Sequence, residues 1–336
     1  MDCPVLIEAL RGALVESRHR GAVAVVDADG RVLLAVGDVE SPTYPRSAVK
    51  ALQALVLVET GAVERYGLRD EELALACASH GGEADHVAGV ASMLARAGLD
   101  QGSLMCGTHW PLHQPAALAL ARIGGGATAL HNNCSGKHAG FLCAACAMEC
   151  EPATYVDVHH PVQQAVKAVL ENLGGAPIPD NHIGVDGCSV PTFAMPLRRL
   201  ALAFARFGTG RGLAPERHAA AQRLRAVCAA FPWHIAGTGR FCTELMTDMR
   251  ERVFVKTGAE GVLCAALPEQ GLGFALKIED GATRAAEAAM AALLVRFLPR
   301  DDDFRPELER HARPLLRNWH KTVVGSLQPT AALTGA

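Results

Sequence analysis

The stretch VFVKTGAEGVLCAALPEQGLGFALKIE, residues 253–279, decides the fold, because it contains three short apolar runs separated by turns. The runs are residues 253–256, 262–267 and 273–279, and Gly, Pro and charged residues lie between them. Apolar runs of this length bounded by turn-forming residues predict β-strands. Residues 282–298 follow with a pattern that carries one Glu and two Arg, which predicts an amphipathic helix rather than a membrane span.

The first part of the chain has the same strand character. Val23–Asp27 and Arg31–Val36 are apolar-rich runs joined across DADG, and Gly30 can adopt the positive φ that a hairpin turn requires. Strands from the two ends of a chain can pair in one antiparallel sheet, with the middle inserted as a second lobe. We therefore predict an α/β (α+β) fold with a sheet lobe from residues 1–60 and 250–328, a mainly helical lobe from residues 61–249, and a loose tail at 329–336.

Helical periodicity dominates from Tyr44 to about Leu245. The first predicted helix, residues 44–61, ends at Gly61, a plausible C-cap. Further predicted helices are Glu71–Ala78, Glu83–Ala97, Pro115–Arg122, Gly140–Met148, Pro161–Leu173 and His218–Ala230.

Composition excludes several functional classes. The chain has 336 residues, 50% of them hydrophobic and 20% charged, and its net charge is −3 without a basic block, which does not favour binding to nucleic acid or to a membrane. The N-terminal residues do not have the pattern of a signal peptide. Eleven cysteines, most of them in apolar runs, indicate free thiols in a reducing cytoplasm.

Lysine is rare in this chain, which makes Lys50 informative. Only six of the 32 basic residues are lysine, so most positively charged residues of the surface are expected to be arginine. Ser47 and Lys50 are spaced i, i+3, which places them on one face of a helix. A serine hydroxyl needs a base to become a nucleophile, and a buried lysine can be neutral whereas arginine stays protonated. The pair predicts an activated serine.

A second motif follows on the late strands. Lys256-Thr257-Gly258 matches the Lys-Thr-Gly element that faces a Ser-x-x-Lys serine in penicillin-binding proteins and serine β-lactamases, and it has the same order along the chain. Ser79 is our candidate for the intermediate serine that moves protons between lysines, although Ser79-His80-Gly81 departs from the Ser-Asp-Asn form of that element. A solvated Lys256 at the end of a strand is the competing interpretation.

Two cysteines differ from the others because they lie in polar, turn-forming segments. Cys134 is in LHNNCSGKHAGFL, and Cys188 is in GVDGCSVPTF. Composition alone leaves three interpretations open: two free thiols, a disulfide, or a metal site. Thiolates suit zinc, which would then need further ligands, for which Lys137, His138 and Asp186 are candidates.

Taken together, seven segments resemble the Rhizobium-type L-asparaginases, the asparaginase II family. The resemblance runs from about residue 4 to about residue 326, and the motifs keep their order. The segments are YPRSAVKALQAL (44–55), CASHGGEADHV (77–87), CGTHWPLH (106–113), LHNNCSGKHAGFL (130–142), GVDGCSVPTFAMPL (184–197), KTGAEGV (256–262) and KIEDGATRA (277–285).

The resemblance implies a fold similar to serine β-lactamases and one class of glutaminases, and hydrolysis of L-asparagine to L-aspartate and ammonia. It implies that Ser47 is the nucleophile with Lys50 as its partner, that Ser79 and Lys256 complete a second Ser–Lys pair, and that the chain forms a homodimer. It also implies a zinc site made of Cys134, Lys137 and Cys188.

Charge alone suggests which groups meet the rest of the substrate. We expect Arg46 and His80 to serve the α-carboxylate and Asp186 to serve the α-ammonium group. The alternatives are a glutaminase or β-lactam hydrolase with the same Ser–Lys machinery, and a zinc-stabilised binding protein without turnover.

Overall fold

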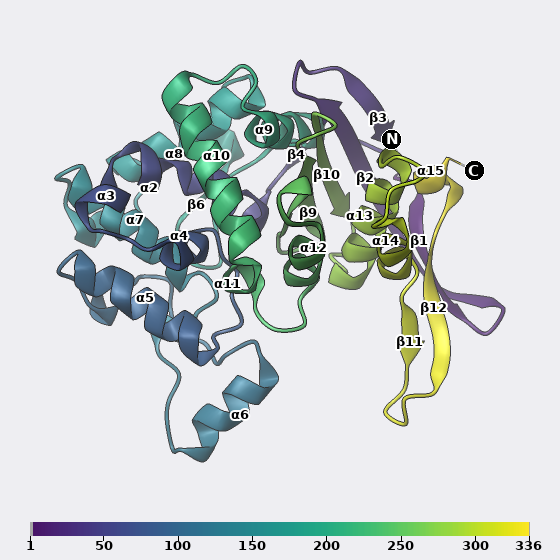
Figure 1. Ribbon diagram of the computed structural model, residues 1–336, viewed down its shortest axis with the longest axis horizontal. Coiled ribbons are helices and arrows are strands. Elements are labelled where there is room, and N and C mark those ends of the chain that lie inside the picture. Colours follow the sequence, from purple (N-terminus) through teal and green to yellow (C-terminus); the bar gives the residue numbers. More distant parts are fainter. Residues whose placement is uncertain (1–2, 336) are drawn as a thin grey trace.

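A computed structural model describes residues 3–335 and shows one large antiparallel sheet beside a group of helices (Figure 1). The strand order is β11-β12-β1-β2-β10-β9-β8, with β3 paired to β2. The sheet therefore combines strands from the two ends of the chain, as predicted. The large sheet consists of β1 (Val5–Arg11), β2 (Leu14–Asp27), β3 (Val32–Val36), β8 (Phe254–Thr257), β9 (Val262–Leu267), β10 (Leu272–Ile278), β11 (Leu315–Arg317) and β12 (Val323–Pro329).

The strand β2 joins the two halves of this sheet. Its first part pairs with β1, and its second part pairs with β10 on one side and β3 on the other. The β2–β3 hairpin and the three late strands are confirmed. The strand β1, the first half of β2 and the β11–β12 hairpin were not predicted. The exposed first half of β2 (LVESRHR) carries few apolar residues, so its hydrophobic pattern is weak.

Two short two-stranded ladders lie outside the large sheet. One pairs β4 (Pro42–Thr43) with β7 (Met195–Pro196), and the other pairs β5 (Ile183–Val185) with β6 (Pro191–Phe193). The first ladder leads directly into the segment that carries Ser47, and the turn of the second carries Cys188.

The middle of the chain is helical, as predicted, but its first segment is broken. Residues 46–59 form a 3₁₀ turn, η1 (Arg46–Val49), and two short helices instead of one continuous helix. Gly61 then adopts φ 71°, which fits its predicted place at a helix end. The α-helices of the middle region are α1 (Lys50–Gln53), α2 (Leu55–Glu59), α3 (Ala62–Arg65), α4 (Asp70–Ala76), α5 (Ala84–Arg96), α6 (Gln114–Arg122), α7 (Ser135–Ala147), α8 (Pro161–Gly174), α9 (Leu197–Thr209), α10 (Pro215–Ala230), α11 (Pro232–Ala236) and α12 (Phe241–Met249).

Both faces of the central strands are covered by helices. The helix α9 packs against β2, β9 and β10, while α13 (Thr283–Phe297) packs against β1, β9, β10 and β12. Every residue of β9 is buried, although successive side chains point to opposite faces. The helix α9, which was not among the predicted ranges, therefore belongs with the sheet in space although it is part of the inserted sequence.

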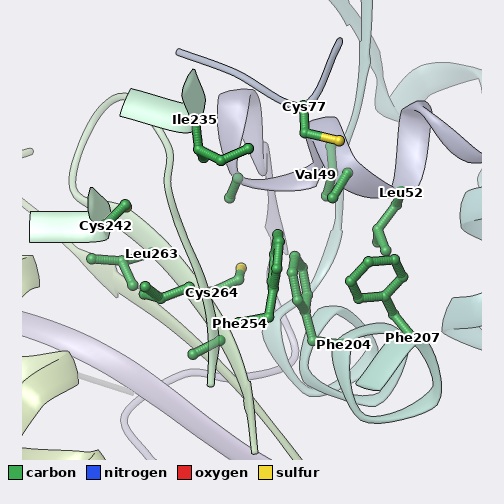
Figure 2. Close-up of a cluster of buried hydrophobic side chains, with 14 of the residues drawn as sticks. Val49, Leu52, Cys77, Phe204, Phe207, Ile235, Cys242, Phe254, Leu263 and Cys264 are labelled. Carbon is green, nitrogen blue, oxygen red and sulfur yellow. The ribbon is translucent and has the colours of Figure 1, made fainter. Parts of the chain in front are cut away.

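A cluster of apolar side chains lies where the sheet meets the helices (Figure 2). Phe204 and Phe207 of α9 contact Phe254 of β8, with ring centroids 6.1 and 5.2 Å apart. Val49 and Leu52, which follow Ser47 along the chain, belong to the same cluster. The turn that carries Ser47 is thus anchored to the core.

The cysteines and the C-terminal residues complete the comparison with the sequence. All eleven cysteines are free, and eight of them are buried, as expected for apolar core residues. The predicted loose tail is wrong: β12 extends to Pro329, α15 (Ala331–Thr334) follows, and Leu333 is fully buried. A further helix, α14 (Arg305–Ala312), packs on α13. Between residues 3 and 335, no helix has the length and apolar character that crossing a membrane requires.

Candidate active site

A pocket of about 180 Å³ opens between the sheet and the helical region. Three of the four predicted catalytic residues line it: Ser47 from η1, Ser79 from the loop after α4, and Lys256 from β8. The remaining lining residues are Asn133, Ala236, Arg240, Phe241, Cys242, Thr257, Gly258, Ala259 and Thr283. Residues separated by more than 200 positions in the chain therefore meet at one cavity.

Ser47 is held by a tight and unusual backbone. Arg46 adopts φ 52°, a left-handed conformation that costs energy for a residue with a side chain. The end of β8 passes so close that a Cβ on Gly258 would lie 2.6 Å from the carbonyl oxygen of Pro45. Glycine at position 258 therefore allows the Lys-Thr-Gly segment to lie against the turn that presents Ser47.

The amine of Lys50 does not form the expected hydrogen bond with Ser47. Lys50 is fully buried, and its Nζ donates to Ala78 O at 2.7 Å, to Ser79 Oγ at 3.0 Å and to Cys134 Sγ at 3.2 Å. Among the described residues, no hydrogen bond joins the Ser47 hydroxyl to the amine. The i, i+3 spacing predicts that Lys50 lies on the same face as Ser47, but tertiary contacts direct its amine toward Ser79.

Ser79 lies between two buried lysines. Its hydroxyl is 3.0 Å from Lys50 Nζ and 2.9 Å from Lys256 Nζ. The backbone of Ser79 is held by a hydrogen bond from its N–H to Ile235 O at 2.8 Å. A hydroxyl can accept a proton from one neighbour while it donates to another, so the arrangement Lys50–Ser79–Lys256 can move a proton.

Lys256 is suited to gain and lose a proton near neutral pH. Its side chain is 1% exposed, and this burial, with the positive charges of Lys50 and Arg240, lowers its pKa to about 7 although Cys242 opposes the shift. Its Nζ also donates to Thr257 O at 2.9 Å. The competing interpretation of Lys256 as a solvated strand-end residue is wrong.

The two polar-segment cysteines meet at a buried cluster next to Lys50. Lys137 Nζ donates to Cys188 Sγ at 3.0 Å, and Lys50 Nζ donates to Cys134 Sγ at 3.2 Å. The neighbouring Cys188 and the positive charges of Lys50 and Lys137 hold the pKa of Cys134 well below its usual value, although burial opposes the shift. The neighbouring Cys134 and burial raise the pKa of Cys188.

The chemistry of this cluster fits a zinc ion. The amine of Lys137 lies 3.0 Å from Cys188 Sγ, Cys134 neighbours both residues, and thiolates are preferred ligands of zinc. His138 is buried beside them, and its Nε2 has no hydrogen-bond partner among residues 3–335. Within the same range no three His, Cys, Asp or Glu side chains gather to hold a metal, so such a site depends on Lys137.

The three residues expected to hold the rest of the substrate do not line the pocket. Arg46 Nε donates to Asp186 Oδ1 at 2.6 Å, so the opposite charges of these two residues are paired with each other. His80 is fully enclosed: its Nδ1 accepts from Gly82 N at 3.1 Å, and its Nε2 lies 2.9 Å from Ser135 Oγ. Burial holds the pKa of His80 well below its usual value, so it is neutral and braces the loop that carries Ser79.

Sequence reasoning missed five polar residues of the pocket: Asn133, Arg240, Cys242, Thr257 and Thr283. Asn133 is fixed by a hydrogen bond from its N–H to His109 Nε2 at 3.0 Å. Cys242 contacts Thr257 through Sγ and Oγ1 at 3.1 Å. Asn133 and Thr257 stood inside quoted motifs, whereas no spacing pattern pointed to Arg240 or Cys242.

Comparisons with known proteins come from sequence families and from solved structures. The L-asparaginase II family profile matches residues 7–329. A β-lactamase from Mycobacterium bovis is similar in structure, with 15% sequence identity, coverage of 79% of this chain and 89% of that chain, and a TM-score of 0.38. Mglu is similar with 16% identity, coverage of 84% and 69%, and a TM-score of 0.40. No curated protein matches the chain.

Proposed function

The chain belongs to the L-asparaginase II family and is an asparaginase-type amidohydrolase, and from this premise we propose that it hydrolyses L-asparagine to L-aspartate and ammonia with Ser47 as the nucleophile. The observation that supports the mechanism is the arrangement of Ser47 on a small pocket next to Ser79, whose hydroxyl contacts two buried lysines. A serine beside a base of tuned pKa is the requirement for nucleophilic attack on an amide.

In the first step Ser47 Oγ attacks the side-chain amide carbon and forms a carbon–oxygen bond. Its proton passes to the hydrogen-bonded group made of Lys50, Ser79 and Lys256. The amine of Lys256 can accept a proton because its pKa is about 7, so it is partly neutral near neutral pH. The base in this proposal is the hydrogen-bonded group of Lys50, Ser79 and Lys256 rather than Lys50 alone, since Lys50 is hydrogen-bonded to Ser79.

The negative charge that develops on the amide oxygen needs donors. The N–H of Ser47 lies at the start of η1, and the N–H of Ala259 makes no backbone hydrogen bond within residues 3–335. Both residues line the pocket, so we assign these two N–H groups to the oxyanion.

The second half of the reaction reverses the proton flow. The carbon–nitrogen bond breaks as Lys256 returns a proton through Ser79 to the leaving nitrogen, and ammonia departs. A water molecule then attacks the β-aspartyl ester and gives a proton to the same hydrogen-bonded group of Lys50, Ser79 and Lys256. The bond between the acyl carbon and Ser47 Oγ breaks, the proton returns to Ser47 Oγ, and L-aspartate leaves.

We also propose that Cys134, Lys137 and Cys188 hold zinc. When bound, the ion would supply positive charge beside Lys50 and Ser79, but two thiolates neutralise most of that charge, so we expect it to organise the site rather than to activate water. The purified protein should contain about one zinc per chain, and Cys188→Ala should lose it while Cys150→Ala keeps it. Metal analysis by mass spectrometry measures this, and zinc retained in Cys188→Ala would contradict the assignment.

Ammonia release from L-asparagine and from L-glutamine, together with the absorbance change of a chromogenic β-lactam, tests the substrate. We expect turnover of L-asparagine, its loss in Ser47→Ala, and its retention in Ser103→Ala. Ser103 is the control because it does not line the pocket and its side chain makes no hydrogen bond with any residue between 3 and 335. Hydroxylamine should trap the acyl-enzyme as β-aspartyl hydroxamate. Turnover that survives in Ser47→Ala would move the nucleophile to Ser79, and faster turnover of glutamine or the β-lactam would replace the proposed substrate.

A further inference from the structure

Arg240 is a pocket residue without a partner. It precedes α12, lines the same cavity as Ser47 and Lys256, and is close enough to Lys256 for its charge to lower the pKa of that amine. Its guanidinium makes no ion pair and no hydrogen bond with any residue between 3 and 335, whereas Arg46, Arg198, Arg217 and Arg252 all have carboxylate partners.

The surroundings compensate the positive charge of Arg240 only in part. None of the residues that line the pocket in the described part of the chain is Asp or Glu. Two carboxyls lie outside the pocket near Arg240: Glu287 on α13, which interacts with the charge of Arg240, and Glu244 in the first turn of α12. Burial raises the pKa of Glu287 to about 7 although Arg240 opposes the shift, so this carboxyl neutralises Arg240 incompletely.

A second feature next to Arg240 also favours an anion. Phe241 and Cys242 begin α12, a helix of nine residues whose first turn also contains Glu244, and both line the pocket. The N–H groups in the first turn of a helix carry partial positive charge and lack partners within the helix. Arg240 and the first two residues of this helix therefore line the same cavity.

We propose that Arg240 binds the α-carboxylate of the substrate and so restricts turnover to amides that carry a carboxylate. The inference rests on the proposed function, because it concerns the same pocket. In L-asparagine the carboxylate is separated from the reacting amide by only two carbons, so both ends of the substrate must lie within one small cavity. A guanidinium is suited to this role because its two parallel N–H groups match a carboxylate.

Arg46 is the competing arginine, and its geometry argues against it. It is hydrogen-bonded to Asp186 at 2.6 Å and does not line the pocket, so it would have to leave a partly buried ion pair in order to bind substrate. Arg240 has no such ion-pair partner to leave among residues 3–335.

Two analogues of asparagine, each lacking one group, make the test specific. Succinamate keeps the carboxylate and lacks the amino group, whereas 3-aminopropanamide keeps the amino group and lacks the carboxylate. Arg240→Met should lower kcat/KM for L-asparagine and for succinamate, mainly through KM, about 10- to 100-fold more than for 3-aminopropanamide, whose turnover reports only the effect of the lost charge on Lys256. Arg240→Lys keeps the charge but not the fork and should give an intermediate loss.

Arg211→Met is the matched control, because Arg211 pairs with Asp29 on the surface away from the pocket. Equal losses on all three substrates in Arg240→Met would overturn the proposal, as would a carboxylate-dependent loss in Arg46→Met instead. Calorimetric titration with L-aspartate separates this proposal from the proposed function. If the wild type hydrolyses no amide but binds L-aspartate in an Arg240-dependent way, only the proposed function fails; an affinity independent of Arg240, or no binding, overturns the role of Arg240.

Discussion

At the scale of single residues, the chemistry depends on lysines that the fold removes from water. Lys50 and Lys256 are both essentially unexposed, and their amines are joined through one serine hydroxyl. Burial of an amine disfavours its charged form, so the fold itself converts Lys256 into a group that titrates near neutral pH. Arginine at the same position would stay protonated and would end proton transfer.

The activity should therefore depend on pH through Lys256. Because its pKa is about 7, the neutral form becomes more populated as the pH rises from 6 to 8, and kcat/KM for L-asparagine should rise across this range and then level off. Lys256→Arg should lower kcat by at least about 100-fold at every pH in the range. A rise that persists unchanged in Lys256→Arg would assign the titration to another group.

Stability should respond to the same residue with a defined sign. The folded pKa of Lys256, about 7, lies below its usual value of 10.5, so between these values the unfolded chain binds more protons and the free energy of unfolding increases with pH. Relative to Lys256→Met, the wild type should gain about 2–3 kcal/mol between pH 6 and pH 9. Urea unfolding of both proteins over this range measures the difference, and parallel curves would contradict the assigned pKa.

At the scale of elements, the site depends on how closely helices approach each other. The helix α7 begins directly after Cys134 and packs against α4, the helix that precedes Ser79. A Cβ on Gly136 would lie 2.2 Å from the carbonyl oxygen of Leu75. Glycine at position 136 thus allows the two segments that carry Cys134 and Ser79 to lie together.

Gly136→Ala should separate these helices. The added methyl group meets backbone rather than a flexible side chain, so we expect a loss of about 1–3 kcal/mol in the free energy of unfolding, together with reduced turnover. Gly126→Ala is the matched control, because a Cβ there meets nothing within 4 Å. Its stability should be unchanged or slightly higher. Equal effects of the two substitutions would show that the close contact is unimportant.

At the scale of the whole molecule, the two ends of the chain stabilise each other. The strand β1 pairs with β12, Thr330 N donates to Leu6 O at 2.9 Å, and the Thr330 hydroxyl donates to Val5 O at 2.7 Å. Figure 1 shows both termini on the same side of the sheet, beside α15. The sheet that supports Lys256 is thus completed by residues from the last part of the chain.

Leu333→Ala tests this contribution. Leu333 is fully buried, so the substitution should lower the free energy of unfolding by about 2–3 kcal/mol through the cavity it creates. Leu14→Ala is the control, because Leu14 is 76% exposed and its truncation should change stability by less than about 0.5 kcal/mol. A loose C-terminal segment would instead make the two substitutions equivalent.

The sequence by itself determined the fold class and most of the site's composition. The hairpin at Gly30, the late strands and most helices follow from local periodicity and turn residues, because hydrophobic spacing reflects which face of an element is buried. The rare lysines identified Lys50 and Lys256, since a chain that writes its surface cations as arginine has a separate reason for lysine. The two polar-segment cysteines identified the thiol pair in the same way.

Only the tertiary structure decided which groups meet. Helical spacing predicted a contact between Lys50 and Ser47, but burial directs the amine to Ser79, Ala78 and Cys134, which are distant in the sequence. Arg240 lines the pocket although no local sequence pattern predicted it. Arg46 and Asp186 were predicted to bind substrate, but they pair with each other and do not line the pocket. The pKa of Lys256 likewise depends on long-range packing. Local patterns record the environment of one element, whereas desolvation and pairing require segments that only the folded chain brings together.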